Sequence, residues 1–175
     1  MPVRSQTGFT LIEVLVSTLV LTVGILGVAA MQMVSFQTNQ SAYARSQAVY
    51  LAQDIFDRMR ANPTGYRTTT VYDAVDTSNT ATIPASPSCV SSTGGCSPAQ
   101  MAQQDLREWA SGFYNVENRD EYRPILPNGV GTLTRDGTSN EFTAVISWND
   151  REFDTAGNLT RAMVTRSISI RATMN

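Results

Sequence analysis

The sequence contains no lysine and no histidine. All 13 of its basic residues are arginines, and 15 acidic residues outnumber them, so the formal net charge is −2. The chain therefore offers no histidine general base, no histidine metal ligand, no Schiff-base lysine and no P-loop lysine. The arginines are dispersed, whereas a nucleic-acid-binding protein needs a basic patch. We predict a non-enzymatic protein with no catalytic site, cofactor, bound metal or nucleic-acid partner.

Charge is also missing from a long N-terminal segment. No charged residue occurs between Glu13 and Arg45, and residues 9–36 are apolar apart from Glu13 and a few Thr, Ser and Gln residues. About 20 apolar residues are enough to span a bilayer as a helix. The run is too long for the apolar region of a secretory signal peptide, which has roughly 7–15 residues. The pattern predicts one membrane-spanning helix followed by one small soluble domain.

The helix is predicted to continue beyond its apolar part. No proline occurs between residue 9 and Pro63. Because the residue before a proline is disfavoured in the α region, we expect helix to about Ala61. Within residues 37–62, apolar residues recur at helical spacing and most charges fall on other faces, which predicts an amphipathic helix packed on a globular head. The apolar positions are Ala44, Ala48, Leu51, Ala52, Ile55, Phe56 and Met59.

The middle of the chain combines a loop with a second helix. Residues 64–96 are rich in Thr, Ser, Asn, Pro and Gly, which predicts a long and mostly irregular loop. Ser97 and Gln100 have capping-box spacing and Pro98 stands at the first helical position, so a helix should begin here. Its packed face should carry Met101, Leu106, Trp109 and Phe113.

The last third of the chain predicts an antiparallel sheet of three or four strands with one buried face. Val130–Thr134 is a short strand candidate, and residues 154–158 should form a loop. Two further strands are indicated by alternating apolar residues, with Arg166 as a misfit in the second. The alternating residues are Phe142, Ala144, Ile146 and Trp148, then Val164, Ile168, Ile170 and Ala172.

The only two cysteines, Cys89 and Cys96, are separated by six residues. This spacing does not fit a CxxC redox motif, and the pair alone supplies too few ligands for a metal. We therefore predict a structural disulfide that closes a glycine-containing loop. Such a bond requires an oxidising compartment, which places the head in the periplasm or outside the cell. Arg4 and Arg45 lie on opposite sides of the apolar helix, so charge bias alone does not orient it.

Other polar and aromatic residues fit structural roles. The carboxylate pairs Asp54/Asp57 and Asp105/Glu108 each have helical spacing, and we interpret both as solvated surface. Trp109 and Trp148 occupy apolar positions, where core packing is expected.

The strongest signal lies in the first 13 residues. A short polar leader ends at Gly8, Phe9 opens the apolar helix, and Thr-Leu-Ile follows before Glu13. This stretch resembles the class III signal of type IV pilins and pseudopilins. The resemblance implies an α+β type IV pilin fold, in which a long helix packs on a small antiparallel sheet with a second helix. It also implies that a prepilin peptidase cleaves after Gly8 and methylates Phe9, and that Glu13 guides docking into the fibre.

The chemistry of these residues agrees with that reading. Gly8 has no side chain, so an extended backbone can enter a narrow peptidase cleft. A carboxylate such as Glu13 is costly in apolar surroundings, by about a few kcal/mol, unless it reaches water or a cation. Cleavage after Gly8 would create an ammonium group at Phe9, and Glu13 of a neighbouring chain could pair with it. In the alternative interpretation, Glu13 simply lies in the interfacial layer at a helix end.

A narrower resemblance covers the rest of the chain. Several stretches resemble the PilV minor pilins, also called type IV pilus modification proteins. They are residues 24–32, 52–63, the Cys89/Cys96 pair with the following residues 97–109, 126–131 and 145–148. The resemblance implies a low-abundance subunit that primes pilus assembly with other minor pilins and the major pilin. It would be a single-pass inner-membrane protein with a periplasmic head, and later part of the extracellular pilus near its tip.

The expected organisation is a leader at 1–8, a transmembrane and assembly helix at 9–36, an amphipathic continuation at 37–62 and a globular head at 63–175. Two other functions stay open. A minor pseudopilin of a type II secretion system would share the signal and the helix. A membrane-anchored periplasmic enzyme would need a convergent polar site.

Overall fold

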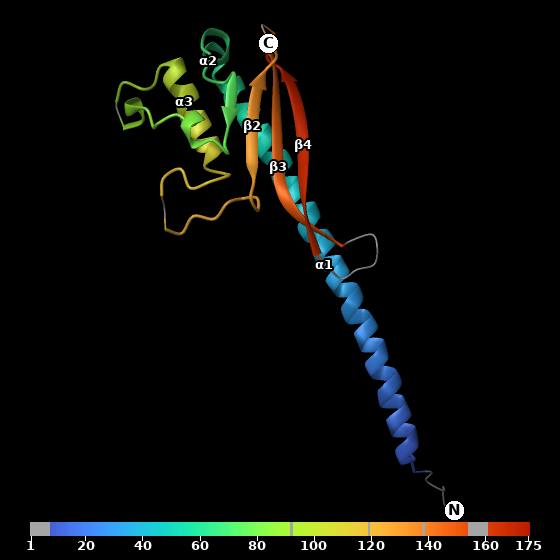
Figure 1. Ribbon diagram of the computed structural model, residues 1–175. Helices are drawn as coiled ribbons and strands as arrows, with labels where there is room; N and C mark the ends of the chain where they lie inside the picture. The colour runs from blue at the N-terminus through green and yellow to red at the C-terminus, as the bar shows by residue number, and fades with distance from the viewer. Residues whose placement is uncertain (1–7, 92, 119, 138, 154–160) are drawn as a thin grey trace, which may run out of the picture. The chain divides into compact units, whose positions relative to one another are not determined.

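The computed structural model describes residues 8–91, 93–118, 120–137, 139–153 and 161–175. The chain divides after Gln40 into two compact units, which are described separately. The helices are α1 (Leu11–Ala61), α2 (Pro63–Thr68) and α3 (Pro98–Ala110), with two short 3-10 turns at Thr80–Thr82 and Ser88–Ser91 (Figure 1). The strands are β1 (Ala74–Asp76), β2 (Val130–Arg135), β3 (Glu141–Phe153) and β4 (Arg161–Thr173).

The first unit contains the apolar part of α1. Every residue from Leu11 to Phe36 is exposed within the chain, although most of these side chains are apolar. By length and composition, α1 is able to cross a membrane. An apolar helix without a covering partner in its own chain requires lipid or other proteins around it.

The end of α1 agrees with the prediction, and the loop after it contains two elements that were not predicted. Helix α1 ends at Ala61, and α2 begins at Pro63 with Asn62 as its N-cap. The Asn62 side chain accepts a hydrogen bond from the Gly65 amide at 3.1 Å. The segment from residue 64 to 96 was predicted to be mostly irregular, but it also contains regular structure that was not predicted, namely the rest of α2 and strand β1. The proline that ends one helix suits the first position of the next, where its missing N–H is not needed.

The second unit contains a four-stranded sheet in the order β1-β2-β3-β4 with antiparallel neighbours. The predicted α+β fold is confirmed. In the register, Leu133 pairs with Ala144, which in turn pairs with Ile170. The predicted loop at 154–158 lies outside the described residues.

The predicted alternation along β3 and β4 is also observed. The apolar residues of β3 are buried: Phe142, Ala144, Ile146 and Trp148. The predicted apolar residues of β4 are partly buried: Val164, Ile168, Ile170 and Ala172. Arg166, the misfit in the pattern, is exposed. A sheet with this pattern needs a cover on one face only.

The second part of α1 supplies that cover. Figure 1 shows α1 passing behind β2, β3 and β4, and a single core cluster joins these elements. The buried α1 residues are Ala48, Leu51, Ala52, Ile55, Phe56 and Met59. The amphipathic pattern in the sequence therefore identified the packed face correctly.

Helix α3 completes the core of the second unit. Ser97 and Gln100 form the predicted capping box, with the Ser97 amide donating to Gln100 Oε1 at 3.0 Å. On the packed face, Met101 was predicted wrongly: it is exposed, and Ala102 is buried in its place. The predicted core role of Trp109 is confirmed, because its ring is buried.

The Trp109 side chain also links two helices. Its Nε1 donates to the Leu51 carbonyl oxygen of α1 at 2.8 Å. Its ring meets Phe113 edge-on, with centroids 5.0 Å apart. Just before this helix, Cys89 and Cys96 form a disulfide with their Cα atoms 5.0 Å apart. The bond therefore closes the chain directly in front of the Ser97 cap.

Candidate functional site

The start of α1 is organised by Thr10. Gly8, Phe9 and Thr10 precede the helix, which begins at Leu11. The Thr10 carbonyl oxygen accepts the first helical hydrogen bonds, from the amides of Glu13 at 3.1 Å and Val14 at 3.3 Å. The Thr10 hydroxyl oxygen also accepts from the Glu13 amide, at 3.4 Å. Thr10 is therefore the N-cap of the helix.

Glu13 lies in the first turn of α1. The spacing of Thr10 and Glu13 is that of a capping box, in which the Glu side chain reaches back to the N-cap amide. The structure forms only the first half of this motif, and the Glu13 carboxylate has no partner among the described residues. The first helical turn favours negative charge, because the aligned peptide dipoles are positive there. The carboxylate is thus placed favourably and left available.

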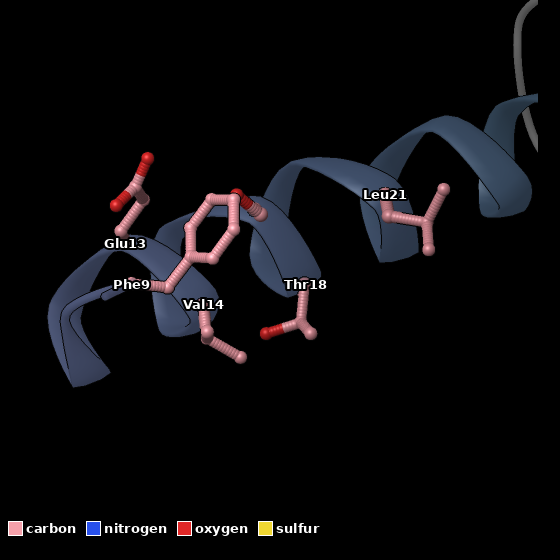
Figure 2. Close-up of a pocket in the computed structure, with 6 residues that line it drawn as sticks. Phe9, Glu13, Val14, Thr18 and Leu21 are labelled. Atoms are coloured by element: carbon pink, nitrogen blue, oxygen red, sulfur yellow. The ribbon is translucent and has the colours of Figure 1, made fainter. Parts of the chain in front are cut away.

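The Glu13 side chain borders a shallow apolar groove of about 500 Å³ along the helix. Its lining residues are Phe9, Glu13, Val14, Ser17, Thr18 and Leu21. In Figure 2 the Glu13 carboxylate points away from the Val14 and Thr18 side chains. The Thr18 hydroxyl donates to the Leu15 carbonyl at 2.9 Å, so it is already paired. Among the lining residues, Glu13 is the one that carries a charge.

This arrangement is chemically suited to recognising a partner. An apolar groove beside one carboxylate suits an apolar helix that brings a positive charge. The structure places Gly8 and Phe9 directly before the helix, and Phe9 and Glu13 on one groove. The other predicted site pair, Cys89 and Cys96, belongs to the second unit.

The second unit contains a polar cluster that sequence reasoning missed, formed by Arg58, Tyr72 and Asp105. Asp105 was expected at the solvated surface, but it is buried. The Tyr72 hydroxyl donates to its Oδ2 at 2.5 Å, and Arg58 Nη1 lies 4.0 Å from its Oδ1. The helical period contained the signal, since Asp105 follows the buried Ala102 by three residues and precedes the buried Trp109 by four. Position on the packed face therefore decides its burial.

The cluster is tied into the surrounding elements by further bonds. Arg58 also pairs with Asp54 at 3.0 Å and with Glu108 at 2.5 Å. The Asn62 side chain donates to the Pro98 carbonyl at 2.8 Å. These contacts join the end of α1 to α3 and to the segment before β1.

Burial and hydrogen bonding shift the ionisation of these groups. Burial raises the pKa of Asp105, although the Tyr72 hydroxyl and Arg58 oppose the shift. Burial, followed by the bond to Asp105, raises the pKa of Tyr72, so its hydroxyl stays a donor at physiological pH. The hydrogen bond from Gln104 and the ion pair with Arg58 lower the pKa of Glu108. The cluster thus combines a neutral phenol with charged groups that are paired internally.

A pocket of about 360 Å³ lies between α3 and the segment after it. Two of its charged residues are used by the fold itself. Arg107 donates to the carbonyls of Pro84 and Val116. Glu108 accepts from Arg58 and Gln104. The described residues contain no group of three or more His, Cys, Asp and Glu side chains that could hold a metal.

A long apolar helix that begins beside an exposed carboxylate, and whose far part packs on a small antiparallel sheet, defines the class of type IV pilin-like proteins. Residues 30–107 match the Tt1218-like family model, described as type IV pilin Tt1218. Residues 3–29 match the prokaryotic N-terminal methylation motif. No curated protein and no solved structure matches the chain.

Over these residues the chain is similar to type IV pilins and to the prepilin N-methylation motif, and its apolar helix fits a membrane-anchored pilin. The motif implies processing by a prepilin peptidase and assembly into a pilus. The pilins are a family of structural subunits.

Proposed function

We propose that the chain is a minor pilin that helps to prime type IV pilus assembly together with other minor pilins and the major pilin. It has no enzymatic role in this proposal. The PilV-like stretches along the chain support the minor-pilin assignment. Residues 1–8 are a leader, 9–36 the membrane and assembly helix, 37–62 its amphipathic continuation, and 63–175 the globular head.

The observation that carries the proposal is the state of Glu13. It is the last charged residue before Arg45, and its carboxylate is exposed at the groove with no partner among the described residues. An anchor needs only apolar length, and a carboxylate weakens insertion. An assembling subunit, by contrast, uses the carboxylate for a partner's charge. Cleavage after Gly8 and methylation of Phe9 supply such a charge on the neighbouring chain.

The disulfide supports a periplasmic head. Disulfides persist in oxidising compartments such as the bacterial periplasm. Cys89 and Cys96 are bonded, so the segment after the helix belongs on that side of the inner membrane. After assembly, the head would be part of the extracellular fibre, near the tip.

Replacing Glu13 by leucine tests the docking role. We expect Glu13→Leu to leave leader cleavage and membrane insertion intact but to impair incorporation into pili and recruitment to other minor pilins. Ser35→Leu is the matched control, because it adds an apolar side chain to the exposed part of α1 outside the groove and removes no charge. Sheared fibres are blotted for the subunit and surface pili are counted. Wild-type incorporation of Glu13→Leu would mean that the residue is only interfacial.

Two further measurements test the processing and the system. Mass spectrometry of the N-terminal peptide should show a mature chain that begins at Phe9 with a methylated amine. An uncleaved Met1 or a start near residue 30 contradicts this. Chains that copurify from membranes should be pilus components, and secretion components in their place would assign the protein as a type II pseudopilin.

A further inference from the structure

We propose that Thr10 is a positioning residue for leader cleavage, because its N-cap holds the Gly8–Phe9 bond outside the helix. The inference rests on the proposed cleavage after Gly8. In that reaction, water adds to the Gly8 carbonyl carbon and the amide C–N bond breaks. Gly8 keeps a carboxyl group, and the amine stays on Phe9.

Among the described residues, Gly8 and Phe9 take part in no helical backbone hydrogen bond. The first carbonyl that accepts helical amides is that of Thr10. Among the described residues, no backbone amide donates to the carbonyl oxygens of Gly8 or Phe9. The Gly8 carbonyl, at which hydrolysis takes place, is therefore accessible and not part of a helical turn.

The position of the cap decides whether that carbonyl is accessible. The carbonyl of an N-cap residue accepts the first hydrogen bond of its helix. If the helix began two residues earlier, Gly8 would be the N-cap and its carbonyl would accept from the Ile12 amide. The scissile bond would then lie in the first turn, and a peptidase would have to unwind the turn before binding an extended chain. Low-polarity surroundings favour the longer helix, because they penalise unpaired amides.

Thr10 competes directly with Gly8 for the role of cap. Threonine and glycine are comparable N-caps, asparagine and serine are better, and alanine is far worse. Phe9 does not prevent a helix from including it. Replacing Thr10 by alanine therefore leaves Gly8 as the better cap and moves the helix start onto the scissile bond. Serine or asparagine at position 10 keeps the start at Leu11.

The test uses the full chain in membranes that contain a prepilin peptidase, and the loss of the leader is followed over time by mass spectrometry. We expect Thr10→Ala to slow cleavage roughly fivefold, the ratio produced by the loss of a typical N-cap. Thr10→Ser and Thr10→Asn should cleave at least as fast as the wild type. Thr22→Ala is the matched control, since it removes a threonine inside α1 that does not line the groove and whose hydroxyl donates to the Leu19 carbonyl oxygen, and it should leave the rate unchanged.

A second measurement separates capping from direct recognition of the side chain. In full-length protein in micelles, Thr10→Ala should slow hydrogen exchange at the Ile12 amide, whereas Thr10→Asn should not. Cleavage of Thr10→Ala at the wild-type rate would overturn the inference. A slow Thr10→Asn would also overturn it, because the peptidase would then be reading the hydroxyl itself. A wild-type chain that is not cut after Gly8 would instead refute the proposed function.

Discussion

Replacing Tyr72 by phenylalanine tests whether the buried polar cluster stabilises the head. The substitution removes only the hydroxyl and retains the ring, which is fully buried. That hydroxyl donates to the Asp105 carboxylate at 2.5 Å. A hydrogen bond to a charged group contributes about 1.5–3 kcal/mol. Arg58, 4.0 Å from Asp105, still compensates part of the buried charge, so we expect a loss of about 2 kcal/mol.

The loss should be visible as a lower melting temperature. For a chain of this size, about 1 kcal/mol shifts the midpoint by roughly 2–4 °C, so Tyr72→Phe should melt about 4–8 °C lower. The fluorescence of Trp109 and Trp148 reports the head alone, because both tryptophans are buried in its core and the chain has no others. The measurement uses the full chain in detergent micelles.

Tyr50→Phe is the matched control. The Tyr50 side chain is 60% exposed, and its hydroxyl has no partner among the described residues, so its removal should change stability by less than about 0.5 kcal/mol. If Tyr72→Phe has the same melting temperature as Tyr50→Phe, the hydrogen bond to Asp105 contributes nothing to stability and our account of the cluster is wrong.

Three further predictions concern the head. Because the raised pKa of Asp105 lets the folded head bind a proton before the unfolded chain does, this residue favours folding as the pH falls toward its ordinary value of 3.8. Asp105→Asn should therefore lose more stability than wild type in denaturant titrations as the pH is lowered from neutral toward about 4; parallel curves would contradict this. Gly131→Ala places a Cβ 2.6 Å from Phe113 Cζ and should lower the free energy of unfolding by about 1–3 kcal/mol. Gly94→Ala is the control, because its Cβ meets nothing within 4 Å and stability should not change. Equal melting curves for the two variants would refute the clash. Cys89→Ser should lower head stability by about 2–3 kcal/mol through the lost loop closure. Free labelling of Cys89 and Cys96 by a thiol reagent in the native wild-type protein would contradict this, because the disulfide would then be absent.

The elements that were predictable from the sequence have strong local signals. Helix α1 has a long apolar run and then an amphipathic period, and α3 has a capping box with proline at its first position. Strand β3 alternates over Phe142 to Trp148. Helix α2 was missed although Asn62 and Pro63 form a cap and a first helical residue, because Pro63 was interpreted only as the end of α1. Strand β1 is too short for any period, and its pairing with β2 is fixed by tertiary contacts.

The candidate site shows a similar division. Gly8, Phe9 and Glu13 were located from their order in the sequence and their resemblance to a known signal. The role of Thr10 was not, although its spacing from Glu13 is that of a capping box, because the two residues were weighed separately. The burial of Asp105 likewise depends on which face of α3 packs inward. Asp105 precedes Trp109 by four residues and therefore shares its face, but it was interpreted only from its spacing to Glu108.

The six α1 residues in the core determine which fragments of this protein can fold on their own. A fragment that begins at Pro63 would keep every strand and α3, yet it would lack one wall of the core and expose the apolar face of β3 to water. Such a fragment should aggregate. The compact unit begins at Ser41, so a water-soluble version for structural work should retain α1 from that residue and omit the apolar part before it. One part of α1 is thus suited to lipid and the other to a water-soluble head. The position at which the chain can be truncated is set by the core residues of α1 and not by the end of the helix.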